Sequence, residues 1–141
     1  MSNIALYPLL RDDDPPSAVI ERPHSQSPFI LLADHAGQRI PSQLGDLGLA
    51  SGEIDRHIGW DIGSLATARL LSQYLDATLI HQQYSRLVID CNRTPGIASS
   101  IPEISEHTRI PRNIGVTVAE AEARRGEVFQ PYHDLITQTL N

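Results

Sequence analysis

The chain has 141 residues, 40% of them apolar, and a formal net charge of −6. A chain of this length forms one domain that buries about two thirds of its unfolded surface. The acidic balance argues against a nucleic-acid partner, because phosphate binding needs a basic face. No apolar run approaches the roughly 20 residues that a membrane span requires, so we expect no membrane partner either.

All eleven basic residues are arginine. This excludes mechanisms that need a lysine, such as a Schiff base, a phosphate-loop lysine or a Ser-Lys dyad. Cys91 is the single cysteine, so it cannot form an internal disulfide. The first residues show no basic segment followed by an apolar one, as a secretion signal would. These features together predict a reducing, cytoplasmic setting.

The first part of the chain divides into a polar segment and a strand. Residues 1–27 are rich in Asp, Pro and Ser, which predicts an extended, loosely ordered arm before a domain at 28–141. Residues 28–33 form a continuous apolar run that predicts a strand. A polar loop that contains glycine follows at 34–41.

The middle of the chain predicts one helix and two more strands. Apolar residues recur at spacings of three and four over residues 52–75, which indicates a helix with Ser51 as its N-cap. Short apolar runs at 77–81 and 86–91 predict strands. The order strand, helix, strand, strand predicts an α/β fold with a parallel or mixed sheet and flanking helices.

The last third predicts a loop and a final helix. Residues 94–116 contain five proline and glycine residues without periodicity, which is typical of a functional or disordered loop. Thr117 and Glu120 form a capping box that opens a helix, and Pro131 should kink it or restart it. With only three confident strands the sheet edges would lie open, which natural folds avoid. We therefore expect an incomplete domain.

The segment 86–93 is the most informative part of the sequence. Asn92 and Arg93 fall where the predicted strand would leave the sheet, and ligands bind at the carboxyl ends of strands. A guanidinium fork and an amide suit a substrate carboxylate; the alternative is that Asp90 and Arg93 only pin a loop. Arg86 begins the same predicted strand, so it need not share a pocket with Arg93. Alternatively, Arg86 could lie on a turn that folds over the site.

Two further positions could carry chemistry. His35 follows the first strand, where a metal ligand or general base fits as well as a loop hydrogen bond. Gln38 lies three residues later in the same loop and could supply a second metal ligand, although its neutral amide is a poor ligand for zinc. Asp61 lies near the apolar face of the predicted helix, where a carboxylate needs a cation or another partner. A salt bridge from Asp61 to Arg86 or Arg93 is the alternative.

Five stretches of this sequence resemble the N-formylglutamate amidohydrolase family, over about residue 28 to residue 141. The resemblance implies a zinc-dependent hydrolase with a phosphorylase/hydrolase-like, zinc-peptidase-like fold. Its substrate would be a small molecule, the N-formyl or N-acyl amide of an acidic amino acid such as N-formylglutamate. The matching stretches are residues 34–41, 45–49, 56–63, 84–93 and 131–133.

The resemblance also implies roles for individual residues. His35 would be a metal ligand, and Asp61, which belongs to the Trp-Asp motif, would be the carboxylate ligand. Asn92 and Arg93 would hold the α-carboxylate of the substrate. Arg86 resembles the arginine that polarises the scissile carbonyl in the related enzymes.

The sequence departs from the family pattern in two ways that matter for the metal. Gln38 stands where the related carboxypeptidases carry a glutamate. The relatives are also nearly twice as long, and their C-terminal half supplies a further histidine ligand and the general-base glutamate. We therefore expect an incomplete zinc site and weak metal binding in this chain. The alternative function is a non-catalytic domain on the same scaffold that binds a carboxylate or a partner.

Overall fold

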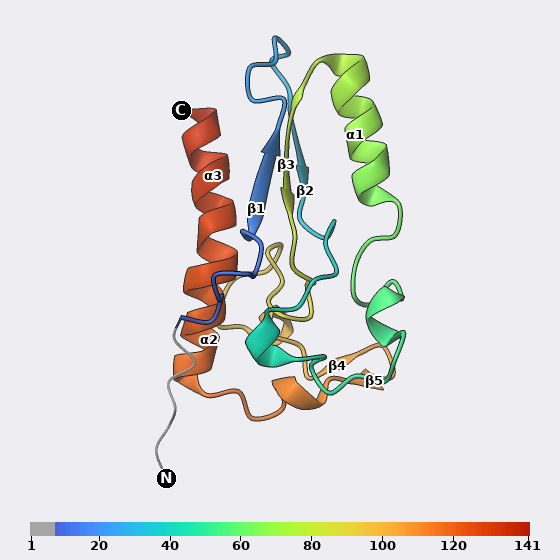
Figure 1. Ribbon diagram of the computed structural model, residues 1–141, viewed down its shortest axis with the longest axis vertical. Helices are drawn as coiled ribbons and strands as arrows, with labels where there is room; N and C mark the ends of the chain where they lie inside the picture. Colours follow the sequence, from blue (N-terminus) through green and yellow to red (C-terminus); the bar gives the residue numbers. More distant parts are fainter. Residues whose placement is uncertain (1–7) are drawn as a thin grey trace.

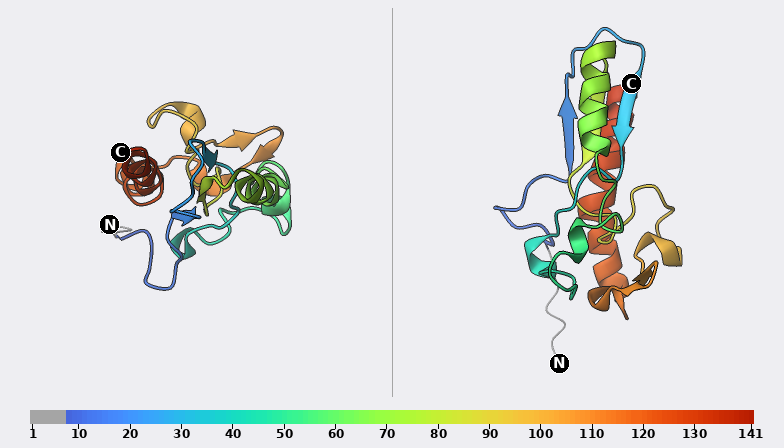
Figure 2. Two further views of the ribbon diagram at one scale, coloured as in Figure 1. Left: turned by 90° about the horizontal axis from the view of Figure 1, so that it is seen from above. Right: turned by 90° about the vertical axis from the view of Figure 1, so that its right-hand side faces the viewer.

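In the computed structural model, which describes residues 8–141, a three-stranded sheet lies between two long helices (Figures 1 and 2). Helix α1 covers the side of β2 and β3, and helix α3 covers the side of β1 and β3. The strands and helices are β1 Ala18–Glu21, β2 Ile30–Ala33, α1 Ser64–Leu75, β3 Thr78–Gln82, β4 Ile104–Ser105, β5 Thr108–Arg109, α2 Val118–Arg124 and α3 Gln130–Leu140.

The sheet is mixed, as the sequence predicts, with the strand order β1-β3-β2. Strand β2 runs parallel to β3, with Leu31 opposite Leu79, and α1 forms the crossover between them. Strand β1 is antiparallel to β3. Because successive side chains of a strand point to opposite faces, Leu79 packs in the cluster of α1 while Ile80 packs against Tyr132 of α3. The central strand is therefore buried on both faces.

The prediction of a loosely ordered arm is wrong for residues 8–27. This segment contains β1, whose apolar and β-branched residues complete one side of β3. Leu9 is fully buried, and the backbone N–H groups of Leu9 and Leu10 donate to the Glu127 carboxylate at 2.7 and 3.1 Å. Residues 1–7 of the predicted arm lie outside the described residues.

The predicted helix over residues 52–75 is wrong in its first half. Only a 3-10 turn, Glu53–Asp55, forms there, and α1 begins at Ser64 rather than after Ser51. Gly63 interrupts the helix with a φ of 83°, in the left-handed region that glycine tolerates. Asp61 consequently lies in the loop before α1, close to the end of β2.

The predicted strand over residues 86–91 is also wrong, although the segment is largely buried as expected. The chain turns instead: the N–H of Val88 donates to the carbonyl of Ser85 at 3.0 Å. Ser85 Oγ accepts from the N–H of Leu87 at 3.1 Å, and the Arg124 guanidinium donates to the carbonyl of Val88 at 2.9 Å. Because side chains satisfy these backbone groups, the segment needs no neighbouring strand.

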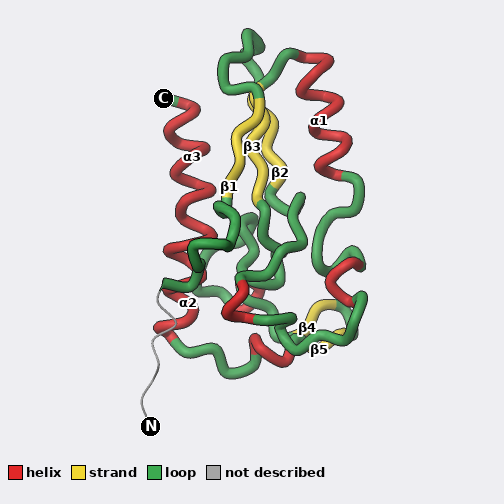
Figure 3. The backbone as a smooth tube through the Cα atoms, viewed as in Figure 1, coloured by secondary structure: helices red, strands yellow, loops and turns green. Residues whose placement is uncertain are grey.

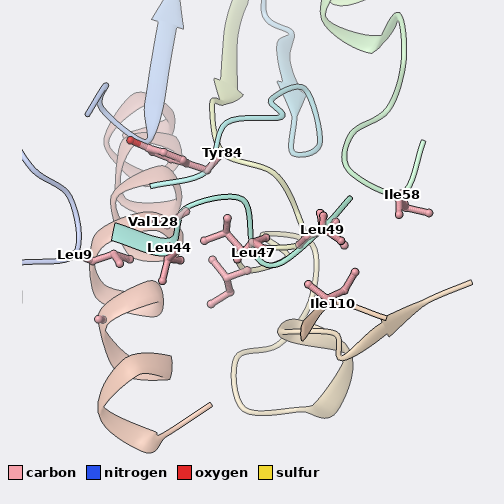
Figure 4. Close-up of a cluster of buried hydrophobic side chains, with 12 residues drawn as sticks. Leu9, Leu44, Leu47, Leu49, Ile58, Tyr84, Ile110 and Val128 are labelled. Atoms are coloured by element: carbon pink, nitrogen blue, oxygen red, sulfur yellow. The ribbon is translucent and has the colours of Figure 1, made fainter. Parts of the chain in front are cut away.

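The largest apolar cluster lies below the sheet, in the half of the molecule that consists mainly of loops (Figures 3 and 4). The long segment 94–116 contributes to this half with the β4–β5 hairpin and two 3-10 turns, Ala98–Ser100 and Pro111–Asn113. Loop residues of several regions therefore share one core. The members labelled in Figure 4 are Leu9, Leu44, Leu47, Leu49, Ile58, Tyr84, Ile110 and Val128.

The C-terminal helical region agrees with its prediction. Thr117 caps α2, since its side chain accepts from the N–H of Glu120 at 3.2 Å. A π-helical stretch, Arg125–Phe129, separates α2 from α3 just before Pro131. Proline lacks an N–H and disturbs the regular helical hydrogen bonds. The helix, which we predicted to kink or restart at Pro131, restarts there as α3 after the π-helical stretch. Among the described residues, no helix is both long and apolar enough to cross a membrane.

Candidate active site

A cleft of about 660 Å³ lies along β2, α1 and the loop that precedes α1. Residues of β2 and α1, apolar and polar, make up most of its lining. The polar residues Asp34, His35, Asp61 and Asn92 also contribute to its lining, the first two directly after the end of β2. The carboxyl end of a strand in a parallel pair is where α/β proteins place their ligands, so this cleft is the candidate active site.

His35 is held by a residue for which the sequence suggested only a loop-pinning role. Its Nε2 lies 2.6 Å from Asp90 Oδ1, and both side chains are 13% exposed. The backbone N–H of Asn92 donates to the same oxygen at 2.8 Å. An ionised Asp90 accepts the Nε2 hydrogen, which leaves Nδ1 of His35 to face other groups. The sequence indicated a role for Asp90 through its position in the stretch 84–93, which resembles the family.

Asp61 and Arg86 meet His35 at its Nδ1 side. Asp61 Oδ2 lies 3.5 Å from Nδ1, and Arg86 Nη1 lies 3.2 Å from Asp61 Oδ1 and 3.4 Å from Nδ1. The expected convergence of His35 and Asp61 is confirmed, and so is the alternative salt bridge to Arg86. Arg86 also donates to the carbonyls of Ile58, at 3.1 Å, and His57. The guanidinium is therefore fixed on two sides, with Nη1 directed at the other two side chains.

Backbone contacts join the segments that carry these side chains. The N–H of Asp61 donates to the carbonyl of His35 at 2.9 Å. The buried Ser85 hydroxyl donates to the carbonyl of Gly59 at 2.6 Å. Arg86 thus lies on a turn rather than in a strand, which is the second of the two positions considered for it. The three elements of the site form one hydrogen-bonded unit.

The His35–Asp90 contact affects the protonation of both residues. The hydrogen bond with Asp90 raises the pKa of His35 above its ordinary value, against the opposing effect of burial. Burial alone would raise the pKa of Asp90, but hydrogen bonds from His35 and the Asn92 backbone outweigh it and leave that pKa lowered. The pair therefore favours a charged ring beside a charged carboxylate over a wider pH range than isolated groups would.

We predict that Asp90→Asn lowers the pKa of His35 in the metal-free protein, because burial then becomes the main influence on the ring. A raised pKa stabilises the fold below the ordinary value of 6.5, and this contribution is lost as pH rises through the folded-state pKa. As pH rises from 6.5 through the folded-state pKa, the Asp90→Asn variant should therefore lose less stability than the unchanged protein. An NMR titration of the His35 ring measures the shift; exposed Asp46→Asn is the control, and an unchanged His35 pKa would contradict the prediction.

Two predicted site residues lie apart from this group. Gln38 donates to Asp55 at 3.2 Å and lines a separate cavity of about 250 Å³. Its geometry gives no support to a ligand role, which stays a prediction. Asn92 lines the cleft as expected, whereas Arg93 is exposed and does not line it. Within residues 8–141 the Arg93 guanidinium has no hydrogen bond and no ion pair closer than 4.0 Å, although its charge helps to lower the pKa of Asp90.

The geometry can be tested against a zinc ion. Two ligands of a tetrahedral zinc with bonds near 2.1 Å lie about 3.4 Å apart, and His35 Nδ1 and Asp61 Oδ2 are 3.5 Å apart. The described part of the chain contains no group of three or more His, Cys, Asp or Glu side chains that could hold a metal. The present residues thus fit two of the three protein ligands that a catalytic zinc takes.

Comparison with known proteins connects this geometry to a family. No curated protein matches the chain. A solved structure, described as the gene product Atu2144 from Agrobacterium tumefaciens, matches with a TM-score of 0.91 and 36% identity. The match covers 94% of this chain and 52% of that one, so the chain spans about half of the solved protein. The model of the family N-formylglutamate amidohydrolase matches residues 27–141, which confirms the resemblance, and the chain belongs to that family.

Proposed function

We propose that this chain carries part of a metal-dependent active site that hydrolyses the N-formyl or N-acyl amide of an acidic amino acid, such as N-formylglutamate. The observation that supports this most is the convergence of His35, Asp61 and Arg86 beside the cleft. The cleft volume of about 660 Å³ lies in the range of sites for small molecules. A zinc-peptidase-like fold is part of the same proposal.

The residues of the chain would prepare the site for the metal. His35 Nδ1 and Asp61 would hold zinc, which when bound supplies a Lewis acid for the amide carbonyl and activates water. Asp90 is a positioning residue: its bond to Nε2 fixes the orientation of the ring and increases the basicity of Nδ1. Gln38 would remain outside this set as long as it bonds Asp55.

Arg86 would act on the substrate directly. Its Nε and Nη2 are bound by backbone carbonyls, so Nη1 is a donor held in place before the substrate arrives. Such a donor stabilises the negative charge that develops on the oxygen of a carbonyl under attack. Asn92, at the lining of the cleft, and the neighbouring Arg93 would bind the α-carboxylate of the substrate.

In a form of the protein that turns over, such as a full-length enzyme, we expect Arg93→Ala to raise KM for an acidic substrate and to change kcat much less. A lost charge-assisted, bidentate contact costs about 2–4 kcal/mol, or roughly 30- to 1000-fold in kcat/KM. Arg93→Lys should restore only part of the loss, because a point charge does not reproduce the fork. Steady-state kinetics measure both variants. A kcat/KM equal to that of the unchanged protein in Arg93→Ala would refute the carboxylate contact.

The experiment that tests the function measures zinc content and N-formylglutamate hydrolysis on the purified 141-residue chain. Zinc-dependent turnover that His35→Ala abolishes would support the hydrolase function over the binding domain, and it would contradict the expectation of an incomplete zinc site in this chain. Formylglutamate binding without zinc and without turnover would favour the alternative, a non-catalytic carboxylate-binding domain. Exposed His24→Ala is the matched control, since His24 does not line the cleft.

We also propose a reducing, cytoplasmic location. The single cysteine, Cys91, is buried and free. Burial raises the pKa of its thiol to about 12, so the thiolate that would form a disulfide is scarce at neutral pH. Fractionation of cells that express the chain, with the chain found in the cytoplasmic fraction, would be the supporting result.

A further inference from the structure

The turn of the β4–β5 hairpin holds a glutamate in a conformation that favours glycine. Ser105 of β4 pairs with Thr108 of β5, so Glu106 and His107 alone form the turn. Glu106 has a φ of 54°, a positive value that glycine, asparagine and aspartate adopt most easily in such two-residue turns. A long side chain in this region of φ is strained and persists where the surrounding structure holds it. The contacts of Glu106 therefore indicate what the residue does.

Glu106 lies against the loop that precedes α1, which runs beside the hairpin in Figure 1. His57 Nε2 lies 2.6 Å from Glu106 Oε1, and Arg56 Nη2 lies 3.6 Å from Glu106 Oε2. The hydrogen bond with His57 is the main reason why the pKa of Glu106 is lowered, so the carboxylate is ionised at neutral pH. Arg56 also donates to Thr108 Oγ1, on the other side of the turn, at 3.0 Å. Side chains thus join the hairpin to loop 56–58 at two points.

The same loop fixes Arg86 of the candidate active site. Arg86 Nη2 donates to the carbonyl of His57, and Nε donates to the carbonyl of Ile58 at 3.1 Å. Ile58 is buried in the largest apolar cluster, so packing fixes its carbonyl. The His57 side chain is 58% exposed, and within residues 8–141 its ring makes a hydrogen bond to Glu106 only. The position of the acceptor for Arg86 Nη2 therefore depends on Glu106.

We propose that Glu106 is a positioning residue for the candidate active site. Glu106 accepts from His57 Nε2 and so holds the His57 carbonyl that binds Arg86 Nη2. With Nη2 held, rotation of the guanidinium about its Nε–Cζ bond is restricted, and Nη1 stays directed toward Asp61 Oδ1, 3.2 Å away. A donor that is fixed before the substrate arrives stabilises a developing oxyanion without reorganisation during the reaction. Only this catalytic use of Arg86 rests on the proposed function; the contacts from the hairpin to Arg86 do not.

A contribution to the stability of the fold does not explain this arrangement. The side chains of His57 and Glu106 are 58% and 50% exposed, and exposed pairs of this kind contribute little to the free energy of unfolding. The change Glu106→Gly would also relieve the strain of the positive φ, because glycine adopts such values readily. The fold should therefore be about as stable without the carboxylate, and the loss should appear at Arg86 instead.

The test uses NMR to measure how fast the Arg86 guanidinium rotates about its Nε–Cζ bond in the 141-residue chain. We expect Glu106→Gly to accelerate this rotation by about tenfold or more, the factor that one hydrogen bond to a charged group corresponds to. His57→Ala should have the same effect, and the double variant should add nothing, because both changes break one contact. Asp76→Gly is the matched control and should leave the rotation unchanged. Asp76 also has a positive φ, 46°, and an exposed ion pair, with Arg22, but it lies at the C-terminal end of α1.

The outcomes separate positioning from stability and from the proposed function. An unchanged rotation rate in Glu106→Gly would overturn the proposal, and so would a urea midpoint far below that of Asp76→Gly, which would assign Glu106 a structural role. In a form of the protein that hydrolyses N-formylglutamate, Glu106→Gly should lower kcat about tenfold and change KM less; an unchanged kcat would overturn the positioning role. If no form of the protein turns over, the proposed function fails, whereas faster rotation in Glu106→Gly still supports the contacts that lead from the hairpin to Arg86.

Discussion

Replacing Arg124 with Ala is expected to lower the free energy of unfolding by about 3–5 kcal/mol. Arg124 is fully buried. Its guanidinium donates to Val88 O at 2.9 Å, Asn113 Oδ1 at 2.7 Å and Glu120 Oε1 at 2.7 Å. The substitution leaves a cavity and three buried acceptors without their donor, which is costly in a domain whose total stability is about 5–15 kcal/mol.

The neighbouring Arg125→Ala is the matched control for this prediction. Arg125 lies one residue further along the chain, and its side chain is 38% exposed in an ion pair with Glu122 at 3.0 Å. Exposed pairs of this kind contribute about 0–1 kcal/mol. Urea unfolding followed by circular dichroism measures both variants. Equal losses for Arg124→Ala and Arg125→Ala would contradict the central role of the buried guanidinium.

The effect of Arg124 reaches the candidate site through the backbone. The carbonyl of Val88 that it binds lies in the turn between Arg86 and Asp90. Asn113, which Arg124 also binds, donates to the carbonyl of Leu87 at 2.8 Å. The turn therefore depends on side chains that are distant in sequence, so a weakened Arg124 contact should disturb the geometry of His35 as well as the stability of the fold.

The prediction of the fold succeeded where periodicity was regular and local. Strands at 28–33 and 77–81 and the capped helix after Thr117 are confirmed as β2, β3 and α2. The strand at 86–91 was wrong because an apolar, buried run does not say whether a strand or distant side chains satisfy its backbone. The strand β1 was missed because the flanking Pro, Asp and Ser residues suggested disorder, although pairing with β3 orders it.

The candidate site was partly predictable for a related reason. His35 and Asp61 come together as expected, yet not through the predicted helix, since Asp61 lies on a loop that bonds the His35 backbone. The positions of Arg86 and Asp90 depend on the turn that replaces the predicted strand. The distance between His35 and Asp90, 2.6 Å, reflects tertiary contacts that spacing in the sequence does not contain.

Arg86→Ala is expected to reduce kcat for N-formylglutamate by roughly 100- to 1000-fold, in whichever form of the protein turns over. The loss of one fixed donor to a developing oxyanion costs about 2.7–4 kcal/mol. KM should change less, because the contact strengthens in the transition state. Arg86→Lys should recover only part of kcat, since lysine does not reproduce the guanidinium that binds the two backbone carbonyls.

Zinc affinity separates this catalytic role from a merely structural one. Arg86 Nη1 lies 3.2 Å from Asp61 Oδ1 and 3.4 Å from His35 Nδ1, so its positive charge faces the same two side chains that would bind the metal. Removing that charge should leave zinc binding unchanged or tighter, measured by competition with a chromophoric chelator, while turnover falls. Arg69→Ala, which removes an exposed ion pair to Glu21, should change neither quantity. If Arg86→Ala lost zinc binding and turnover together, Arg86 would be a support for the loop before α1 rather than a catalytic residue.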